Sequence, residues 1–113
     1  MELNSYQEDG IVRLEVIGRL DTATAQEFEK KVLAVIEDAG QSFIMDCGGL
    51  EYISSSGLRI MLMMLKKIKN AQGNLVLYRL QNNVSEVFRI CNFTSLFNIT
   101  ASKEAAIELC AAG

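Results

Sequence analysis

Residues 46–70 read DCGGLEYISSSGLRIMLMMLKKIKN, and the rest of the chain is organised around this stretch. It begins at the end of an apolar run, passes through two glycines, and reaches three consecutive serines, Ser54, Ser55 and Ser56. After Gly57 comes a long apolar and basic segment with helical character. A strand, a polar turn and a helix that begins with serines place hydroxyl groups beside the unpaired N–H groups of the helix start. Such a helix end favours a phosphate, either bound as a ligand or attached to serine.

The composition predicts one domain over residues 1–113. Half of the 113 residues are hydrophobic and 22% are charged, and the formal net charge of −3 argues against nucleic acid as a partner. The N-terminal residues lack the basic region and apolar core of a signal peptide. The longest apolar run, Ile60–Leu65, is too short to span a bilayer. We therefore expect a cytoplasmic protein that does not insert into a membrane.

The residue content argues against catalysis and against a cofactor. The chain has no histidine, which removes the usual general base and the commonest nitrogen ligand of metals. No serine-nucleophile, dinucleotide-binding or phosphate-loop motif occurs. Asp21, Asp46 and Glu51 are too scattered in the sequence to predict a metal site. We expect a non-enzymatic protein without cofactor or metal.

The order of the hydrophobic patterns predicts an α/β fold. Alternation over residues 11–18, preceded by Asp9-Gly10, is typical of an N-terminal β-hairpin. Further apolar runs at residues 42–46, 74–80 and 97–100 alternate with segments of helical periodicity. The predicted order ββαβαβαβα gives a mixed four- to five-stranded sheet, built from the hairpin and right-handed βαβ crossovers and packed with about four helices.

Capping residues predict where three of the helices begin. Thr24 and Glu27 have the spacing of a capping box, and so have Asn83 and Glu86. Ser102 precedes the last helix and is expected to cap it.

The helix predicted from Ser55 to Asn70 has one stripe that should pack on the sheet. This stripe comprises Leu58, Met61, Leu62, Leu65 and Ile68. Three more apolar residues, Ile60, Met63 and Met64, fall to its side and are expected to be only partly covered. They either contact a neighbouring helix or form a methionine-bearing patch for a partner. The cluster of Lys66, Lys67 and Lys69 suits the end of a helix and is interpreted as a solvated face.

Two loops are expected to meet at the carboxyl edge of the parallel strands. One carries Asp21 and Thr22, and the other runs from Gly48 to Gly57, so Ser55 should lie near Asp21, with Asp46 also nearby. The serines either cap the helix alone, or one of them is also a phosphoacceptor. A phosphate adds a charge of roughly −1.5 to −2 and changes a docking surface without refolding the domain.

Two motifs resemble the STAS domain family, and within it the single-domain anti-sigma-factor antagonists of bacteria. Residues 18–28, GRLDTATAQEF, resemble the family's G-x-L-D followed by a threonine-alanine helix start. Residues 46–58, DCGGLEYISSSGL, resemble its turn that ends in D-S-S-G-L. The predicted element order matches across nearly the whole chain, so the resemblance implies a STAS-like fold.

The resemblance also implies a phosphorylation-switched binding module. In that family, the first serine of D-S-S-G is phosphorylated by a serine/threonine kinase that is also the anti-sigma factor, and that serine falls on Ser55. The unphosphorylated form binds the kinase, phosphorylation breaks the complex, and a PP2C-like serine phosphatase resets it. Ser54 stands where the family usually has aspartate, so the alternatives are Ser54 or Ser56 as acceptor, a changed kinase preference, or no phosphorylation.

The resemblance places the partner-binding residues around the same turn. They are expected to be Asp21, Thr22, Ser54, Ser56, Gly57, Leu58, Arg59 and Met61. The free domain is expected to be a monomer. A second hypothesis is a STAS subunit of an ABC-type membrane lipid transporter, which binds through the same helix without phosphoserine control.

Overall fold

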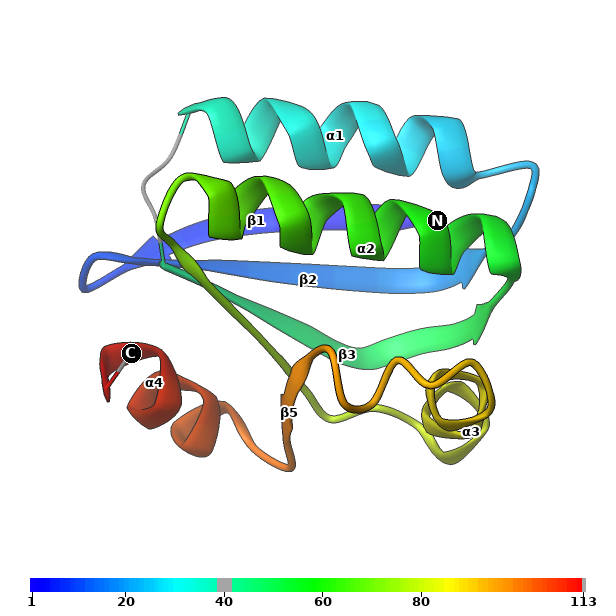
Figure 1. Cartoon of the computed structure of the whole chain (residues 1–113). Helices are drawn as coiled ribbons and strands as arrows, with labels where there is room; N and C mark the ends of the chain where they lie inside the picture. Colours follow the sequence, from blue (N-terminus) through cyan, green and yellow to red (C-terminus); the bar gives the residue numbers. More distant parts are fainter. Residues whose placement is uncertain (39–41, 113) are drawn as a thin grey trace.

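The structure is a computed structural model that describes residues 1–38 and 42–112. Its five strands form one sheet in the order β1-β2-β3-β4-β5 (Figure 1). The strands are β1 (Glu2–Glu8), β2 (Ile11–Leu20), β3 (Ser42–Ile53), β4 (Asn74–Tyr78) and β5 (Asn98–Thr100). The helices are α1 (Ala25–Asp38), α2 (Ser55–Asn70), α3 (Asn82–Ile90) and α4 (Lys103–Ala112). β1 is antiparallel to β2 and every other neighbouring pair is parallel, which confirms the hairpin and the mixed α/β sheet.

The helices cover the two faces of the sheet unequally. The larger core lies under α1, α2 and α3, and Figure 1 shows α1 and α2 side by side along one side of the sheet. Because successive strand residues face opposite sides, Ile44, Val76 and Tyr78 pack on the other face, against Ala106 and Cys110 of α4. The domain therefore has a helical layer on one face and α4 over part of the other.

The N-terminal hairpin forms as its turn residues predict. Asp9 and Gly10 both have positive φ, at 53° and 80°, which is the backbone that a tight hairpin turn requires. On β2, the alternate residues Val12, Leu14 and Val16 are buried. The sequence pattern and the observed burial agree for this hairpin.

The third strand is longer than predicted. The apolar run ends at Asp46, but β3 continues to Ile53 and pairs with β2 as far as Leu20. Gly48 and Gly49 therefore lie within a strand and not in a turn. β3 continues past Asp46 because its backbone pairs with β2. The sequence of residues 47–53 alone does not indicate this pairing.

The capping box predicted for Thr24 and Glu27 is wrong. A capping box forms instead between Asp21 and Thr24, three residues earlier. The Asp21 amide donates to Thr24 Oγ1 at 3.0 Å, and the Thr24 amide donates back to Asp21 Oδ1 at 3.2 Å. Glu27 instead forms an ion pair with Lys31 at 3.2 Å. Asp21 is thus the capping residue of the turn that leads into α1.

The box predicted for Asn83 and Glu86 is also wrong. Gln81 occupies the N-cap position of α3 without a side-chain cap, and Asn83 Nδ2 donates to the Glu51 carbonyl at 2.6 Å. Ser102 does cap the last helix, because its Oγ accepts from the Ala105 amide at 3.1 Å.

The bounds of α2 agree with the prediction, but its buried face is wider. Ile60 and Met64 are 5% and 0% exposed, so the expectation that they are only partly covered is wrong for these two residues. Leu62, which was expected in the packed stripe, is only partly buried, as is Met63. The packing of α1 beside α2 covers a second flank of the helix. Among the described residues, no helix is long and apolar enough to cross a membrane.

Candidate functional site

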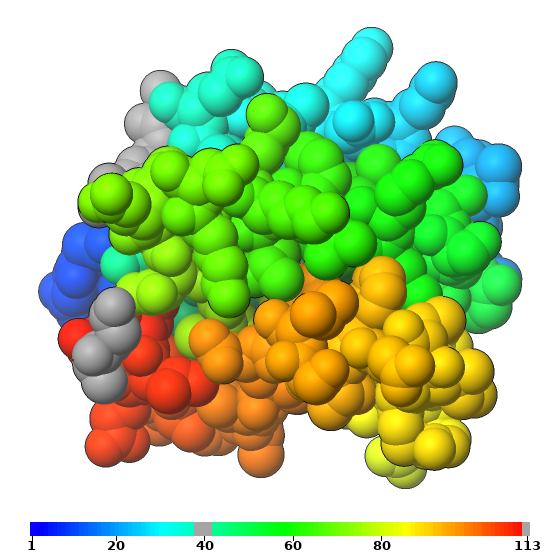
Figure 2. All heavy atoms as spheres, viewed as in Figure 1, coloured from blue at the N-terminus to red at the C-terminus, as the bar shows by residue number. Residues whose placement is uncertain are grey.

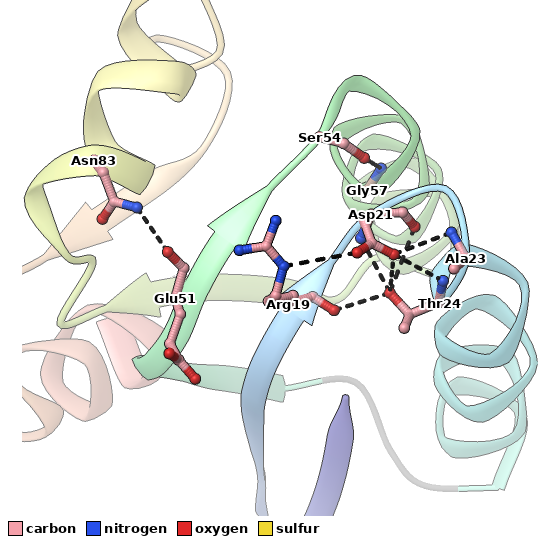
Figure 3. Close-up of polar contacts among 8 residues, drawn as sticks. All are labelled: Arg19, Asp21, Ala23, Thr24, Glu51, Ser54, Gly57 and Asn83. Carbon is pink, nitrogen blue, oxygen red and sulfur yellow. Dashed lines mark hydrogen bonds and ion pairs between the residues drawn. The ribbon is translucent and has the colours of Figure 1, made fainter.

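The loop after β2 and the serine turn after β3 meet at the carboxyl edge of the sheet (Figure 3). The Ser54 amide donates to the Leu20 carbonyl at 2.8 Å. This bond follows directly on the Leu20–Ile53 pair at the end of the parallel ladder. The backbone therefore holds the loop that begins at Asp21 beside the Ser54 turn that begins α2.

The three serines have different environments. Ser54 is the N-cap of α2, with φ −95° and ψ 174°, and its Oγ accepts from the Gly57 amide at 3.3 Å. Ser55 is the first residue of the helix and is exposed, whereas Ser56 is half-buried. The capping function thus falls on Ser54 and leaves the Ser55 side chain at the surface, beside the N–H groups of the first helical turn.

Gly57 allows the first turn of α2 to lie directly on the ends of β2 and β3. A Cβ at this position would lie 2.9 Å from Ile53 Cγ1 and 3.0 Å from Leu20 Cβ. No side chain larger than hydrogen fits there without movement of its neighbours. Gly57 is itself buried, so it positions the serine turn and offers no side chain to a partner.

Two of the residues expected to bind a partner are in the core. Leu58 and Met61 are 3% and 0% exposed, because they lie on the face of α2 that packs on the sheet. In this conformation both side chains pack between α2 and the sheet, which corrects the expectation that they contact a partner. Thr22 and Arg59 are exposed and remain available at the surface.

Asp21 stabilises its own loop. Its Oδ1 accepts from the Ala23 amide at 3.0 Å, in addition to the bond from Thr24, and its Oδ2 lies 3.8 Å from Arg19 Nε. Thr24 Oγ1 also donates to the Arg19 carbonyl at 2.8 Å (Figure 3). These contacts fix the position of a carboxylate beside the serine turn.

Arg19 and Tyr52 form an exposed pair that the sequence motifs did not indicate. The Arg19 guanidinium lies over the Tyr52 ring, with Cζ 4.3 Å from the ring centroid, in a cation–π contact. Their side chains are neighbours because Arg19 and Tyr52 are paired across β2 and β3. Arg19 has 60% of its side chain exposed and Tyr52 is 38% exposed, so both present surface next to the serine turn.

Asp46 is not part of the site, contrary to expectation. It lies on β3 eight residues before Ser54, which is about 26 Å along an extended strand. Its carboxylate accepts from Arg79 Nη1 at 3.1 Å and from the Gly48 amide at 2.9 Å. The extension of β3 to Ile53 separates Asp46 from the serine turn. Glu51 is exposed, and the described residues contain no cluster of carboxylates or thiols that could hold a metal ion.

Comparison with known proteins gives the family. A family model described as the STAS domain matches residues 2–106. The chain belongs to the STAS domain family. BtrV of Bordetella bronchiseptica, described as an anti-sigma factor antagonist, is 37% identical to this STAS domain over 106 residues, which cover 94% of this chain and 91% of that protein.

Solved structures share the fold of this STAS domain. An anti-sigma factor antagonist from Thermotoga maritima has a TM-score of 0.90 at 21% identity, over 96% of this chain and 94% of that one. The Bacillus cell fate determinant SpoIIAA, in its phosphorylated form, has a TM-score of 0.71 at 19% identity, over 95% of this chain and 97% of that one. These likenesses confirm the mixed sheet with four helices.

Proposed function

We propose that this STAS domain is an anti-sigma-factor antagonist whose binding is switched by phosphorylation of Ser55. The observation that carries the proposal is that two adjacent serines differ in their environments: Ser54 caps α2, whereas Ser55 is exposed. Family membership and the description of BtrV support the same function. The domain acts by binding and needs no catalytic residue.

Phosphorylation at Ser55 changes charge and not fold. The phosphate adds roughly −1.5 to −2 charges at the N-terminus of α2, where the backbone N–H groups and the helix dipole tolerate it. The cap does not depend on Ser55, because Ser54 provides it. The Asp21 carboxylate on the adjoining loop adds negative charge to the same surface. The modified surface therefore rejects a partner that docks closely on the unmodified one.

The partner is an anti-sigma serine/threonine kinase, which the unphosphorylated domain sequesters. Its contact surface comprises the exposed or half-exposed Asp21, Thr22, Ser56 and Arg59, together with Arg19 and Tyr52. A PP2C-like serine phosphatase removes the phosphate and restores binding. Ser54 is a poorer acceptor than Ser55, because its hydroxyl oxygen accepts the cap hydrogen bond. We propose a cytoplasmic monomer as the free form.

Co-expression with candidate anti-sigma kinases tests the acceptor. Intact mass should increase by one phosphate, and the modified peptide should contain Ser55 as the modified residue. Ser55→Ala should abolish the modification, whereas the matched variants Ser54→Ala and Ser56→Ala should retain it. Modification that persists in Ser55→Ala would transfer the role to another serine.

Co-purification with the kinase tests the switch. Ser55→Ala should bind constitutively, and Ser55→Asp should bind more weakly, because its carboxylate brings negative charge to the docking surface. Equal binding of both variants would discard the switch. Association with transporter subunits that neither variant affects would instead favour the transporter hypothesis.

A further inference from the structure

The outer face of α2, away from the serine turn, borders a hollow of about 580 Å³. Its lining residues are Leu62, Leu65, Lys66, Lys69 and Asn70 of α2 and Leu96 of the segment before β5. Figure 2 shows α2, in green, and the orange segment that contains residue 96 on the face toward the viewer. Leu96 is 47% exposed. We call this the α2–Leu96 hollow.

A second hollow of about 340 Å³ lies along the same helix. It is lined by Arg59, Leu62, Met63, Lys66, Lys67 and Asn70. Leu62, Lys66 and Asn70 line both hollows, and their spacing of four residues makes them one row along the helix. The two hollows therefore flank one row and together extend along α2 from Arg59 to Asn70.

This surface is positively charged on an acidic protein. The chain has a net charge of −3, yet α2 contains four cations and no acidic residue. The cations Arg59, Lys66, Lys67 and Lys69 are all exposed, and none forms an ion pair with another described residue. Glu37 of α1 lines a neighbouring hollow together with Lys67. Lys66 and Lys69, which border the α2–Leu96 hollow, do not line the hollow that contains Glu37.

We propose that the α2–Leu96 hollow binds an acidic amphipathic helix of a protein partner. Apolar side chains of that helix would contact Leu62, Leu65 and Leu96, and its carboxylates would face Lys66 and Lys69. The spacing of apolar residues at i, i+3, i+4 and i+7 along such a helix suits a groove that follows α2. The charges of the two surfaces are then complementary, which favours fast and selective association.

Two features of the surface favour a protein segment over other occupants. The hollow is open to solvent, whereas small-molecule sites enclose most of their ligand. A bilayer surface is broad, so a concavity between α2 and Leu96 would remain unfilled against it. A helix with protruding apolar side chains fills the concavity.

The α2–Leu96 hollow is separate from the proposed phosphoserine. Leu62 follows Ser55 by seven residues, which is about 10 Å along the helix axis, and Asn70 lies about 22 Å from Ser55. The inference therefore does not rest on the phosphorylation switch. It predicts a second contact whose affinity is insensitive to the charge at residue 55.

A synthetic acidic peptide tests the proposal. The probe is a helix of roughly four turns, about 15 residues, with leucine at the i, i+3, i+4 and i+7 positions and glutamate elsewhere. Its control is a peptide of the same composition in scrambled order. Titration into isotope-labelled protein should give saturable NMR shift changes at Leu62, Lys66, Lys69 and Leu96, which weaken as salt screens the charges.

Matched charge reversals identify the binding residues. The double variant Lys66→Glu/Lys69→Glu should bind the peptide at least about tenfold more weakly. The control Lys30→Glu/Lys31→Glu makes the same change of charge on α1, outside the hollows, and should bind as the native protein does. Ser55→Asp should also bind normally, which separates this proposal from the phosphorylation switch.

Three results would overturn the proposal. The first is equal binding of the ordered and scrambled peptides, or no saturable binding of either. The second is equal binding of the two double variants, or shift changes outside the hollow. The third is lysine-dependent binding to vesicles of phosphatidylglycerol and phosphatidylcholine with no binding of the peptide, which would assign the surface to a membrane. Separately, loss of peptide binding in Ser55→Asp would contradict the claim that binding at the α2–Leu96 hollow is independent of the phosphorylation switch.

Discussion

The amide of Ser54 donates to the carbonyl of Leu20 at 2.8 Å, and this bond joins the two halves of the candidate site. It continues the β2–β3 ladder by one residue, so the loop that begins at Asp21 and the helix that begins at Ser55 start from one rigid edge. A charge placed on Ser55 therefore acts on a surface whose geometry the sheet already fixes. This geometry favours a switch that works by electrostatics and contact, without rearrangement of the domain.

Replacement of the capping serine should destabilise the domain more than replacement of the exposed one. Ser54→Ala removes the acceptor for the Gly57 amide and should lower the free energy of unfolding by about 1 kcal/mol. Ser55→Ala, the matched control, should change it by less than about 0.5 kcal/mol, because Ser55 is exposed. Urea denaturation measures both. Equal losses would contradict the assignment of the cap to Ser54.

A methyl group at residue 57 should disturb the contact between α2 and the sheet. Gly57→Ala places a Cβ 2.9 Å from Ile53 Cγ1 and 3.1 Å from the Leu20 carbonyl oxygen, so the helix start must move. We expect a loss of about 1–3 kcal/mol in the free energy of unfolding, measured in urea.

Gly10→Asn is the control for Gly57→Ala. Gly10 has φ +80°, and a Cβ there has no other atom within 4 Å. Asparagine tolerates this backbone, so the cost should stay below about 1 kcal/mol. A Gly57→Ala variant as stable as the native protein would mean that the first turn of α2 is not tightly seated.

The domain should lose stability at alkaline pH, partly through Tyr78. Burial raises the pKa of Tyr78 from its ordinary value of 10.0 to about 12. The unfolded chain thus loses this proton at a lower pH than the folded one, and the stabilisation present below pH 10 is lost as the pH rises toward 12. Burial also raises the pKa of Cys47 to about 12, which adds to the same trend.

Tyr78→Phe should reduce the alkaline loss of stability. At neutral pH this variant should be as stable as the native protein, because Tyr78 Oη has no hydrogen-bond partner among the described residues. Tyr6→Phe, the same change at an exposed tyrosine, is the control. Denaturation curves from pH 7 to about pH 11 measure the effect. An identical slope in Tyr78→Phe and native protein would exclude the contribution of Tyr78.

The exposed Arg19–Tyr52 pair should contribute to partner binding. Exposed tyrosine and arginine side chains at the centre of an interface often carry much of the binding energy. Tyr52→Ala and Arg19→Ala should each weaken binding of the proposed kinase partner by about tenfold. The free energy of unfolding should fall by less than about 1 kcal/mol, because the lost cation–π contact is exposed.

The chain contains a matched control for this pair. Arg13 lies over the Tyr6 ring at the same 4.3 Å, near the other end of β2. Arg13 is seven residues from Leu20, or about 23 Å along the strand. Tyr6→Ala should therefore leave kinase binding unchanged. If Tyr6→Ala and Tyr52→Ala weaken binding equally, the effect is not local to the serine turn.

Patterns that depend on local chemistry were predicted well. The hairpin at Asp9-Gly10, the bounds of α2 and the cap at Ser102 follow from turn preference, helical periodicity and side-chain capping. The two capping boxes failed because the spacing of a box recurs by chance. Asp21 and Thr24 form the box before α1, since the chain leaves β2 at Leu20 and turns there.

The candidate site was only partly predictable, because several of its contacts depend on how distant strands pair. The meeting of the Asp21 loop with the serine turn follows from parallel strand order, and the structure confirms it. The distance of Asp46 from that turn depends on the length of β3, which pairing with β2 decides. The pairing of Arg19 with Tyr52 depends on the strand register, and no local pattern encodes it.

The sequence by itself determined the order of the strands and helices, the inward faces of most of them, and the serine-rich start of α2. These features arise from residue periodicity and turn chemistry, which act over a few neighbouring residues. Only the tertiary structure decided that Ser54 caps the helix while Ser55 is exposed, that Ile60 and Met64 are buried, and that Arg19 stacks on Tyr52. These outcomes depend on strand register and on the seating of α2 against β2 and β3, which contacts between distant parts of the chain determine.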